Sequence, residues 1–243
     1  METKCISGNR DMILHVLQSE LKQNAVLQPG PEFQCTVGEY SLLRDGRITV
    51  EVDTYGLFPK LAVLGLCDAS FEVEEPPAEW YSYAMAGHSA KSLLNLFSMI
   101  SSRQQFLSQA LAAKKGTFCI SRELMEHLLA HPPVTVEHFL QALYDWEGAY
   151  RGIAVSRSYL VLSGFAFCPV EEEAIHRQLA ERMLHVSIHS QWIKPFTRNV
   201  KNKKYAFRTW LNEIGMSGPE YEEARIVMLS RLYGKSDRRS MTR

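Results

Sequence analysis

One long amphipathic segment in the middle of the chain constrains the fold more than any other feature. From His88 to Ala113, apolar side chains recur at the three- and four-residue spacing of an α-helix. Two cations and a glycine, Lys114-Lys-Gly116, then end the pattern at the negative end of the helix dipole. The segment predicts a long helix with one apolar side, formed by Leu93, Leu96, Phe97, Ile100, Phe106, Leu107 and Leu111.

A second long helix is expected further along the chain, and shorter elements lie between the two. Glu171-Glu-Glu173 places three acidic residues in a first turn, where they complement the helix dipole, and the helix reaches about His189. Ser121 and Thr135 are predicted N-caps. The remaining predicted elements are strands at 80–85, 117–120, 153–155 and 159–167, and helices at 122–129 and 136–143.

The first part of the chain predicts a helix followed by a hairpin. Asn9 is placed to cap a helix that runs to about Gln23. Asp45-Gly46 separates two alternating apolar runs, and a tight turn needs the positive φ that glycine supplies. Further elements are expected as strands at 33–37, 40–43, 48–52 and 69–73, and a short helix at 57–66.

Together these elements predict an α+β protein in three parts. Glu74-Glu-Pro-Pro77 has the composition of a linker, because two prolines cannot continue a strand ladder. Residues 1–77 are the predicted N-terminal helix-plus-hairpin module, residues 78–198 a central α/β module around two long helices, and residues 199–243 a basic helical pair. In that pair, a helix at 203–214 and one from Pro219 to Leu232 flank a break at Gly215.

Composition narrows the class of protein. Apolar residues make up 46% and charged residues 22% of the 243 residues, which is typical of a chain that buries a core. The five cysteines are widely spaced, without the C-x-x-C pairs of zinc or redox sites, so we expect free thiols in a cytoplasmic protein. We expect no signal peptide, and no apolar run is long enough to cross a bilayer.

The C-terminal part resembles the closing segment of a family described as virulence-related proteins. The residues that carry the resemblance are Lys204-Tyr-Ala-Phe-Arg208, Trp210-Leu211, Gly215-Met216, Glu220-Tyr221, Ala224-Arg225 and Leu229-Ser-Arg-Leu232. Weaker likeness continues upstream in Val37-Gly-Glu-Tyr40, Asp45-Gly46, Ser121–Leu124, Thr135–Leu140 and Ser163-Gly-Phe165. The resemblance implies a protein carried on conjugative and phage-like elements of anaerobic Gram-positive bacteria, and brings no activity, cofactor or catalytic residue with it.

The charge of the C-terminal part is the clearest indication of a partner. Residues 191–243 hold 12 basic and 5 acidic residues, a net charge of +7, although the whole chain has a formal net charge of zero. Clustered cations neutralise phosphates or dock on an acidic protein surface. The candidate contact residues are Lys201, Lys203, Lys204 and Arg208 before and in the first helix, and Arg231, Lys235, Arg238 and Arg239 after the second.

The acidic start of the second helix argues against a recognition helix in a DNA groove. Glu220, Glu222 and Glu223 would face the phosphates there and be repelled. The cations could also pair with acids of the same chain or of a second copy. A protein partner is therefore preferred over nucleic acid, and an acidic stretch from Glu51 to Glu79 is either a solvated face or a surface for a basic partner.

Several patterns are typical of catalysis or metal binding, but each is incomplete. His127 and His131, and likewise His185 and His189, have one-turn spacing, but no third ligand accompanies either pair. Glu173-Ala-Ile-His176 is a single copy of a spacing that di-iron bundles use twice. Cys119 and Cys168 are interpreted as buried thiols, with the alternative that either meets a histidine in space as a nucleophile.

The sequence thus predicts a non-enzymatic binding or regulatory accessory protein of a mobile element, without cofactor, metal or membrane contact. A variant of this hypothesis is an inhibitor of host defence. The alternative is an enzyme whose site is assembled from dispersed residues, and a deep polar pocket that holds Cys119, Cys168 or a histidine pair would favour it.

Overall fold

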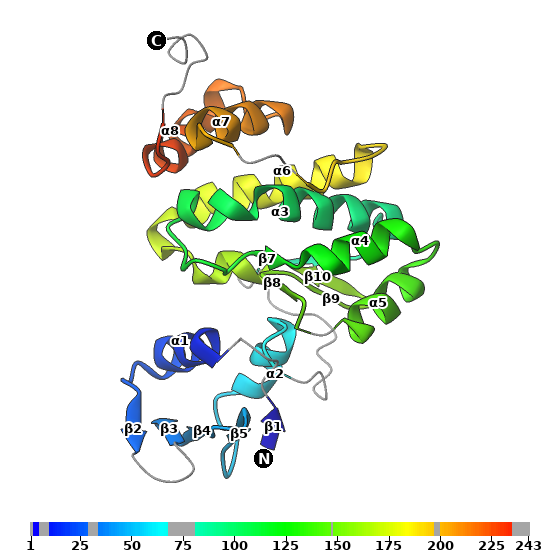
Figure 1. The fold of residues 1–243 in the computed structure, drawn as a ribbon. Helices are drawn as coiled ribbons and strands as arrows, with labels where there is room; N and C mark the ends of the chain where they lie inside the picture. Colours follow the sequence, from blue (N-terminus) through cyan, green and yellow to red (C-terminus); the bar gives the residue numbers. More distant parts are fainter. Residues whose placement is uncertain are drawn as a thin grey trace. The chain divides into compact units, whose positions relative to one another are not determined.

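A computed structural model describes residues 2–4, 10–28, 34–67, 81–146, 148–196 and 200–234. As the sequence predicts, the fold is α+β, with helices and antiparallel strand pairs (Figure 1). Contacts divide the chain into two compact units. Unit 1 comprises residues 1–83 together with 153–163, and unit 2 comprises residues 84–152 and 164–243. Among the described helices, none combines the length and apolarity needed to cross a bilayer.

Unit 1 is built on a five-stranded sheet in the order β1-β5-β4-β3-β2, in which all neighbours are antiparallel. A second sheet has the order β6-β10-β9. The elements of this unit are β1 (Glu2–Lys4), α1 (Arg10–Leu21), β2 (Val26–Gln28), β3 (Gln34–Val37), β4 (Tyr40–Leu42), β5 (Arg47–Thr49), α2 (Leu57–Val63), β6 (Ser82–Ala84), β9 (Ala154–Val155) and β10 (Tyr159–Val161).

The core of unit 1 lies under the inward-facing residues of its strands. Leu42 pairs with Ile48 across the ladder, and both are fully buried, as are Ile13 and Leu17 of α1. Asp53, part of the predicted acidic stretch, has a structural role here. Its carboxylate accepts the backbone amides of the first two residues of α2, at 2.8 and 2.9 Å, and the Tyr40 hydroxyl.

The predicted hairpin at Asp45-Gly46 is present between β4 and β5. Gly46 has a φ of 87°, and its amide donates to the Leu43 carbonyl at 3.2 Å. The Asp45 carboxylate accepts both the backbone amide and the Nε of Arg47. The turn is thus closed by backbone and side-chain hydrogen bonds together, as expected for a connection that needs a positive φ.

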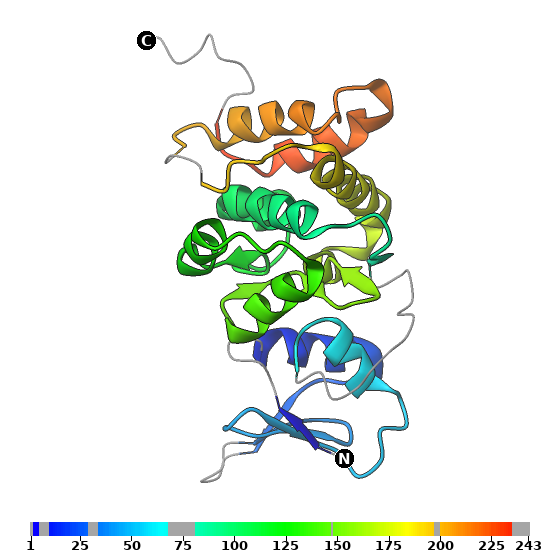
Figure 2. The ribbon, with the colours of Figure 1, turned by 90° about the vertical axis from the view of Figure 1, so that its right-hand side faces the viewer.

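Unit 2 is organised around α3 (Ala90–Ala110), the helix that the amphipathic segment predicts. Helices α4, α5, α6, α7 and α8 all contact it, and Figure 2 shows these helices in layers within the unit. The other elements are β7 (Cys119–Ile120), α4 (Arg122–Ala130), α5 (Val136–Asp145), β8 (Tyr150–Arg151), the 3₁₀ helices η2 (Ser163–Phe167), η3 (Val170–Glu172) and η4 (Pro219–Tyr221), α6 (Glu173–His189), α7 (Lys203–Glu213) and α8 (Glu222–Ser230).

Aromatic pairs fix the packing against α3. Phe97 meets Phe139 of α5 edge to face at 5.2 Å, and Phe106 meets Phe207 of α7 in the same way at 5.6 Å. Such pairs contribute roughly 0.5–1.5 kcal/mol beyond the burial of their area. The predicted caps are also present, since the hydroxyls of Ser121 and Thr135 accept amides in the first turns of α4 and α5.

One predicted strand is partly wrong. The strand expected at 159–167 ends at Val161, and Ser163–Phe167 forms η2 instead. A Cβ on Gly164 would lie 2.3 Å from Phe118, so the chain turns where it meets that ring. The sequence analysis did not anticipate β1, β2 and β8, and the strand expected at 69–73 and the linker 74–77 lie outside the described residues.

We expect Gly46→Val to destabilise the protein by about 1–3 kcal/mol, because a β-branched residue resists a positive φ. Chemical denaturation of both proteins measures the difference. Gly46→Asn is the matched control and should cost less, since asparagine tolerates the left-handed region. Equal stability of the valine variant and the parent would contradict the turn geometry.

Candidate functional site

The basic helical pair, α7 and α8, is anchored to the core of unit 2. Asn202 caps α7 by accepting the Tyr205 amide at 3.0 Å. Trp210 is buried and carries the Arg103 guanidinium over its ring at 5.9 Å. Phe207 is also buried. Phe207 and Trp210 therefore belong to the core.

The break between the two helices is held by arginines. Gly215 has a φ of 85°, and Arg182 of α6 donates to the carbonyl just before it, that of Ile214, at 2.9 Å. Arg225 donates to the Met216 and Gly218 carbonyls at 2.8 and 2.7 Å. Because Arg225 of α8 is bound to these carbonyls, the basic charge of the helical pair is only partly available to a partner.

The candidate contact residues divide into three groups. Lys201 and Arg208 are exposed, and Lys203 and Lys204 are half-buried. Within the described part of the chain, none of the three lysines pairs with an acidic side chain. Arg231 is held inside unit 2, whereas the remaining three predicted residues, Lys235, Arg238 and Arg239, lie outside the described residues.

Arg231 forms a two-pronged ion pair with Glu172 at the start of α6. Its Nη1 donates to Glu172 Oε2 at 2.8 Å and to the Ala110 carbonyl at 3.1 Å, and its Nη2 donates to Glu172 Oε1. The side chain of Gln109 donates in turn to the Arg231 carbonyl at 2.8 Å. Arg231 therefore joins α8 to α3 and α6. The sequence analysis gave such pairing with an acidic residue of the same chain as one alternative for the basic residues.

Behind this ion pair lies a buried histidine. Only 1% of His176 is exposed, and its Nε2 is 3.6 Å from Glu172 Oε2, longer than a hydrogen bond. Neither ring nitrogen finds a hydrogen-bond partner among the described residues. Burial lowers the pKa of His176 below its usual value, whereas the hydrogen bonds from Arg231 lower the pKa of Glu172. At neutral pH the pair is thus a neutral imidazole beside a carboxylate.

Cys168 belongs to the same cluster but is poorly suited to nucleophilic attack. Burial, with a smaller contribution from the Glu172 charge, raises the pKa of its thiol to about 12. Its Sγ donates to the Gly164 carbonyl at 3.5 Å. Because the thiolate is the reactive form, a protonated and buried thiol is inert. The buried-thiol interpretation of Cys168 fits this geometry, and Cys119 is only partly exposed in β7.

The two histidine pairs lie in different surroundings. His127 and His131, 5.1 Å apart between ring centroids, line an open depression of about 400 Å³ together with His138 and Asp145. The second pair, on the last turn of α6, has ring centroids 4.2 Å apart. Across the described ranges, no three His, Cys, Asp or Glu side chains are arranged to hold a metal ion.

A fixed, exposed tryptophan was missed by the sequence analysis. Trp192 is 62% exposed, in the segment that follows α6. Asn95 of α3, only 2% exposed, holds that segment through three bonds: its Nδ2 donates to the Ser187 and Ser190 carbonyls at 3.1 and 2.9 Å, and its Oδ1 accepts the Ile193 amide at 3.1 Å. A polar residue between apolar neighbours of the central helix was the available signal.

Searches with family models, curated protein sequences and solved structures found no match to this chain.

His176 should make stability depend on pH. Its folded pKa lies below the unfolded value of about 6.5, so the unfolded chain binds the proton more readily, and stability is lost as the pH falls below 6.5. We expect His176→Phe to reduce the drop in melting temperature between pH 7.5 and 5.5. The exposed His131→Phe is the control and should leave the drop unchanged. An unaltered drop in the His176 variant would refute this assignment.

Cys168 should resist alkylation in the folded protein. Its thiol is protonated and buried, so maleimide at neutral pH should leave it unmodified until denaturant is added. Peptide mass spectrometry before and after unfolding measures this directly. Rapid modification of Cys168 in the folded state would instead indicate an accessible thiolate and would support the enzyme alternative.

Proposed function

We propose that this protein is a non-enzymatic binding or regulatory accessory of a mobile genetic element, and that it acts by binding an anionic partner, either a protein or a nucleic acid. One observation carries the proposal: Lys201, Lys203 and Lys204 gather at the start of α7 without an ion pair to any described residue. The resemblance of the C-terminal residues to virulence-related proteins supports a role on a mobile genetic element. The free thiols of the four described cysteines support a cytoplasmic location.

The placement of these lysines is unfavourable for the helix itself. The first turns of α4, α5, α6 and α8 carry acidic residues, which suit the positive end of a helix dipole. The first turn of α7 carries Lys203 and Lys204 instead, and has no acidic residue. Each cation at such an end costs roughly 0.3–1 kcal/mol. Charge that weakens its own helix is better explained by an anionic partner than by stability.

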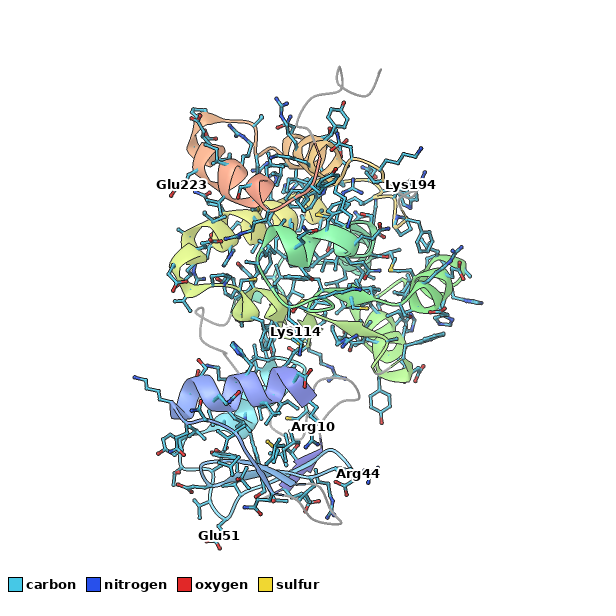
Figure 3. All side chains as sticks on the ribbon, turned by 60° about the vertical axis from the view of Figure 1, so that its left-hand side comes forward. Arg10, Arg44, Glu51, Lys114, Lys194 and Glu223 are labelled. Carbon is cyan, nitrogen blue, oxygen red and sulfur yellow. The ribbon has the colours of Figure 1, made fainter. Side chains whose placement is uncertain are left out.

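The acidic start of α8 favours binding through charge rather than recognition of base sequence in a DNA duplex. Glu222 and Glu223 occupy the first turn of α8, the end that a recognition helix would present to a DNA groove. In Figure 3, Glu223 and Lys194 lie on opposite sides of unit 2. The cation Lys194 and the acidic start of α8 are therefore apart in this view.

The enzyme alternative retains one supporting observation, the depression lined by His127, His131 and His138. It is open and lies between α4 and α5, whereas the buried cluster at Glu172 does not activate its thiol. An open depression encloses a substrate poorly and gives it little exclusion of water. Binding is therefore the better-supported function.

We expect the triple variant Lys201→Glu/Lys203→Glu/Lys204→Glu to lose binding to polyanions without losing stability. Glutamate suits the positive end of α7, so the melting temperature should stay the same or rise. Anisotropy with labelled polyglutamate, duplex DNA and single-stranded oligonucleotides at about 50 mM salt measures binding, and at least one probe should bind the parent about tenfold more tightly than the variant.

A matched control has the same change in net charge in the other unit. Lys22, Arg44 and Arg157 are exposed residues of unit 1, and their reversal to glutamate should leave binding unchanged. Two results would count against the proposal. One is a parent protein that binds none of the probes, and the other is equal loss in both triple variants, which would reflect net charge alone.

A further inference from the structure

We propose that the stretch from the last turn of α6 to α7 is a track for single-stranded nucleic acid, on which Trp192 is a stacking platform for a base. This inference rests on the proposed binding function and names its partner. From Met183 to Asn212 the sequence contains no aspartate or glutamate in 30 residues, but six lysines and arginines. Basic residues interleaved with aromatic ones, free of acids, are typical of proteins that bind single strands.

The two described parts of the track, residues 187–193 and the start of α7, lie near opposite ends of the central helix. Near the start of α3, Asn95 binds the segment 187–193. Near its end, Gln109 donates to Arg231, and the amide of Lys204 donates to the nearby Tyr233 carbonyl at 3.3 Å. From Asn95 to Gln109 the helix rises about 21 Å at 1.5 Å per residue. Trp192 and the lysines at the start of α7 are thus spaced along a length that spans several nucleotides.

The platform is rigid before any ligand arrives. Asn95 uses both polar atoms of its amide on the segment that carries Trp192, and Lys91 donates to the side chain of Gln191 at 2.7 Å. An exposed aromatic side chain on a fixed backbone loses little conformational freedom on binding, so it is well prepared as an anchor. Burial in the core does not explain Trp192, because 62% of this residue is exposed, whereas its neighbour Ile193 is only partly exposed.

Further groups on the same part of the surface suit bases and phosphates. The imidazoles of His185 and His189 are stacked, and burial together with the charges of His189 and Arg182 lowers the pKa of His185, so it offers a neutral ring. Exposed Lys194, labelled in Figure 3, is two residues after Trp192 in the chain and adds a cation to this segment. Stacking rings with adjoining cations recognise bases without regard to their order.

Single strands fit these features better than duplexes or acidic proteins. The flat face of a base is accessible to an indole only when the base is unpaired and unstacked. An acidic protein surface would satisfy the lysines but would leave the exposed indole without a stacking partner. The predicted ligand is therefore a single strand, bound without strong sequence preference and more weakly as the salt concentration rises.

Anisotropy and tryptophan fluorescence on the full chain test the proposal, with labelled single strands of about 12 nucleotides, oligo(dT) and oligo(rU). The parent should bind a single strand more tightly than the matching duplex or polyglutamate. Trp192→Ala should weaken binding about tenfold, and Trp192→Phe should weaken it less because a ring remains. Binding should quench the fluorescence of the parent, and Trp192→Phe should abolish most of that quenching.

Tyr144→Ala is the matched control, because Tyr144 of α5 is 78% exposed and lies outside the track. The Tyr144→Ala variant should bind the single strands as tightly as the parent does. If the single strands bind but Trp192→Ala binds as tightly as the parent, the platform is wrong although the proposed function stands. Tighter binding of polyglutamate or duplex than of single strands overturns the partner named here. If none of these probes binds, this inference and the proposed function both fail.

Discussion

The burial of α3 is the constraint on which the rest of unit 2 depends. Most of this helix is removed from water, including Leu93, Phe97 and Ile100, and every other α-helix of the unit contacts it. Removal of apolar area from water contributes about 25 cal/mol per Å² to stability. The burial of such a helix therefore supplies a large part of the stability of a unit of this size. It therefore fixes where α6 and α7 lie, and with them the surfaces available to a partner.

A helix buried on so many sides places polar groups inside the unit, and several of them bind distant parts of the chain. Asn95 binds the segment after α6, which leaves Trp192 in a defined place. At the other end, the carbonyl of Ala110 accepts Arg231, whose charge is balanced by Glu172. Hydrogen bonds to charged groups contribute roughly 1.5–3 kcal/mol each. Asn95 thus attaches the segment of Trp192 to α3, and Arg231 attaches the end of α8 to α3 and to the start of α6.

The same cluster shows how a pattern of catalytic residue types can be structural. Cys168, Glu172 and His176 include the residue types of a thiol-dependent enzyme. In this environment burial keeps the Cys168 thiol protonated and the His176 imidazole neutral, and Arg231 donates hydrogen bonds to the Glu172 carboxylate. The thiol and the imidazole are thus kept uncharged, and the ion pair between Arg231 and Glu172 links the end of α8 to the start of α6. The three lysines at the start of α7, which form no ion pair to a described residue, are the ones that we propose for binding.

The sequence by itself determined the local elements, because helix periodicity, caps and turn residues act between near neighbours. The central helix, the caps Ser121 and Thr135 and the turn at Gly46 follow from such signals. It also identified the basic residues, but not which of them are used internally. Only the tertiary structure shows that Arg231 is bound to Glu172 whereas Lys201 has no such ion pair to a described residue. Likewise, only the tertiary structure shows that residues 153–163 belong to unit 1 and that the strand ends at Val161. These outcomes depend on contacts between residues far apart in the chain, such as Asn95 with Ile193, and no local pattern encodes which distant group a side chain will meet.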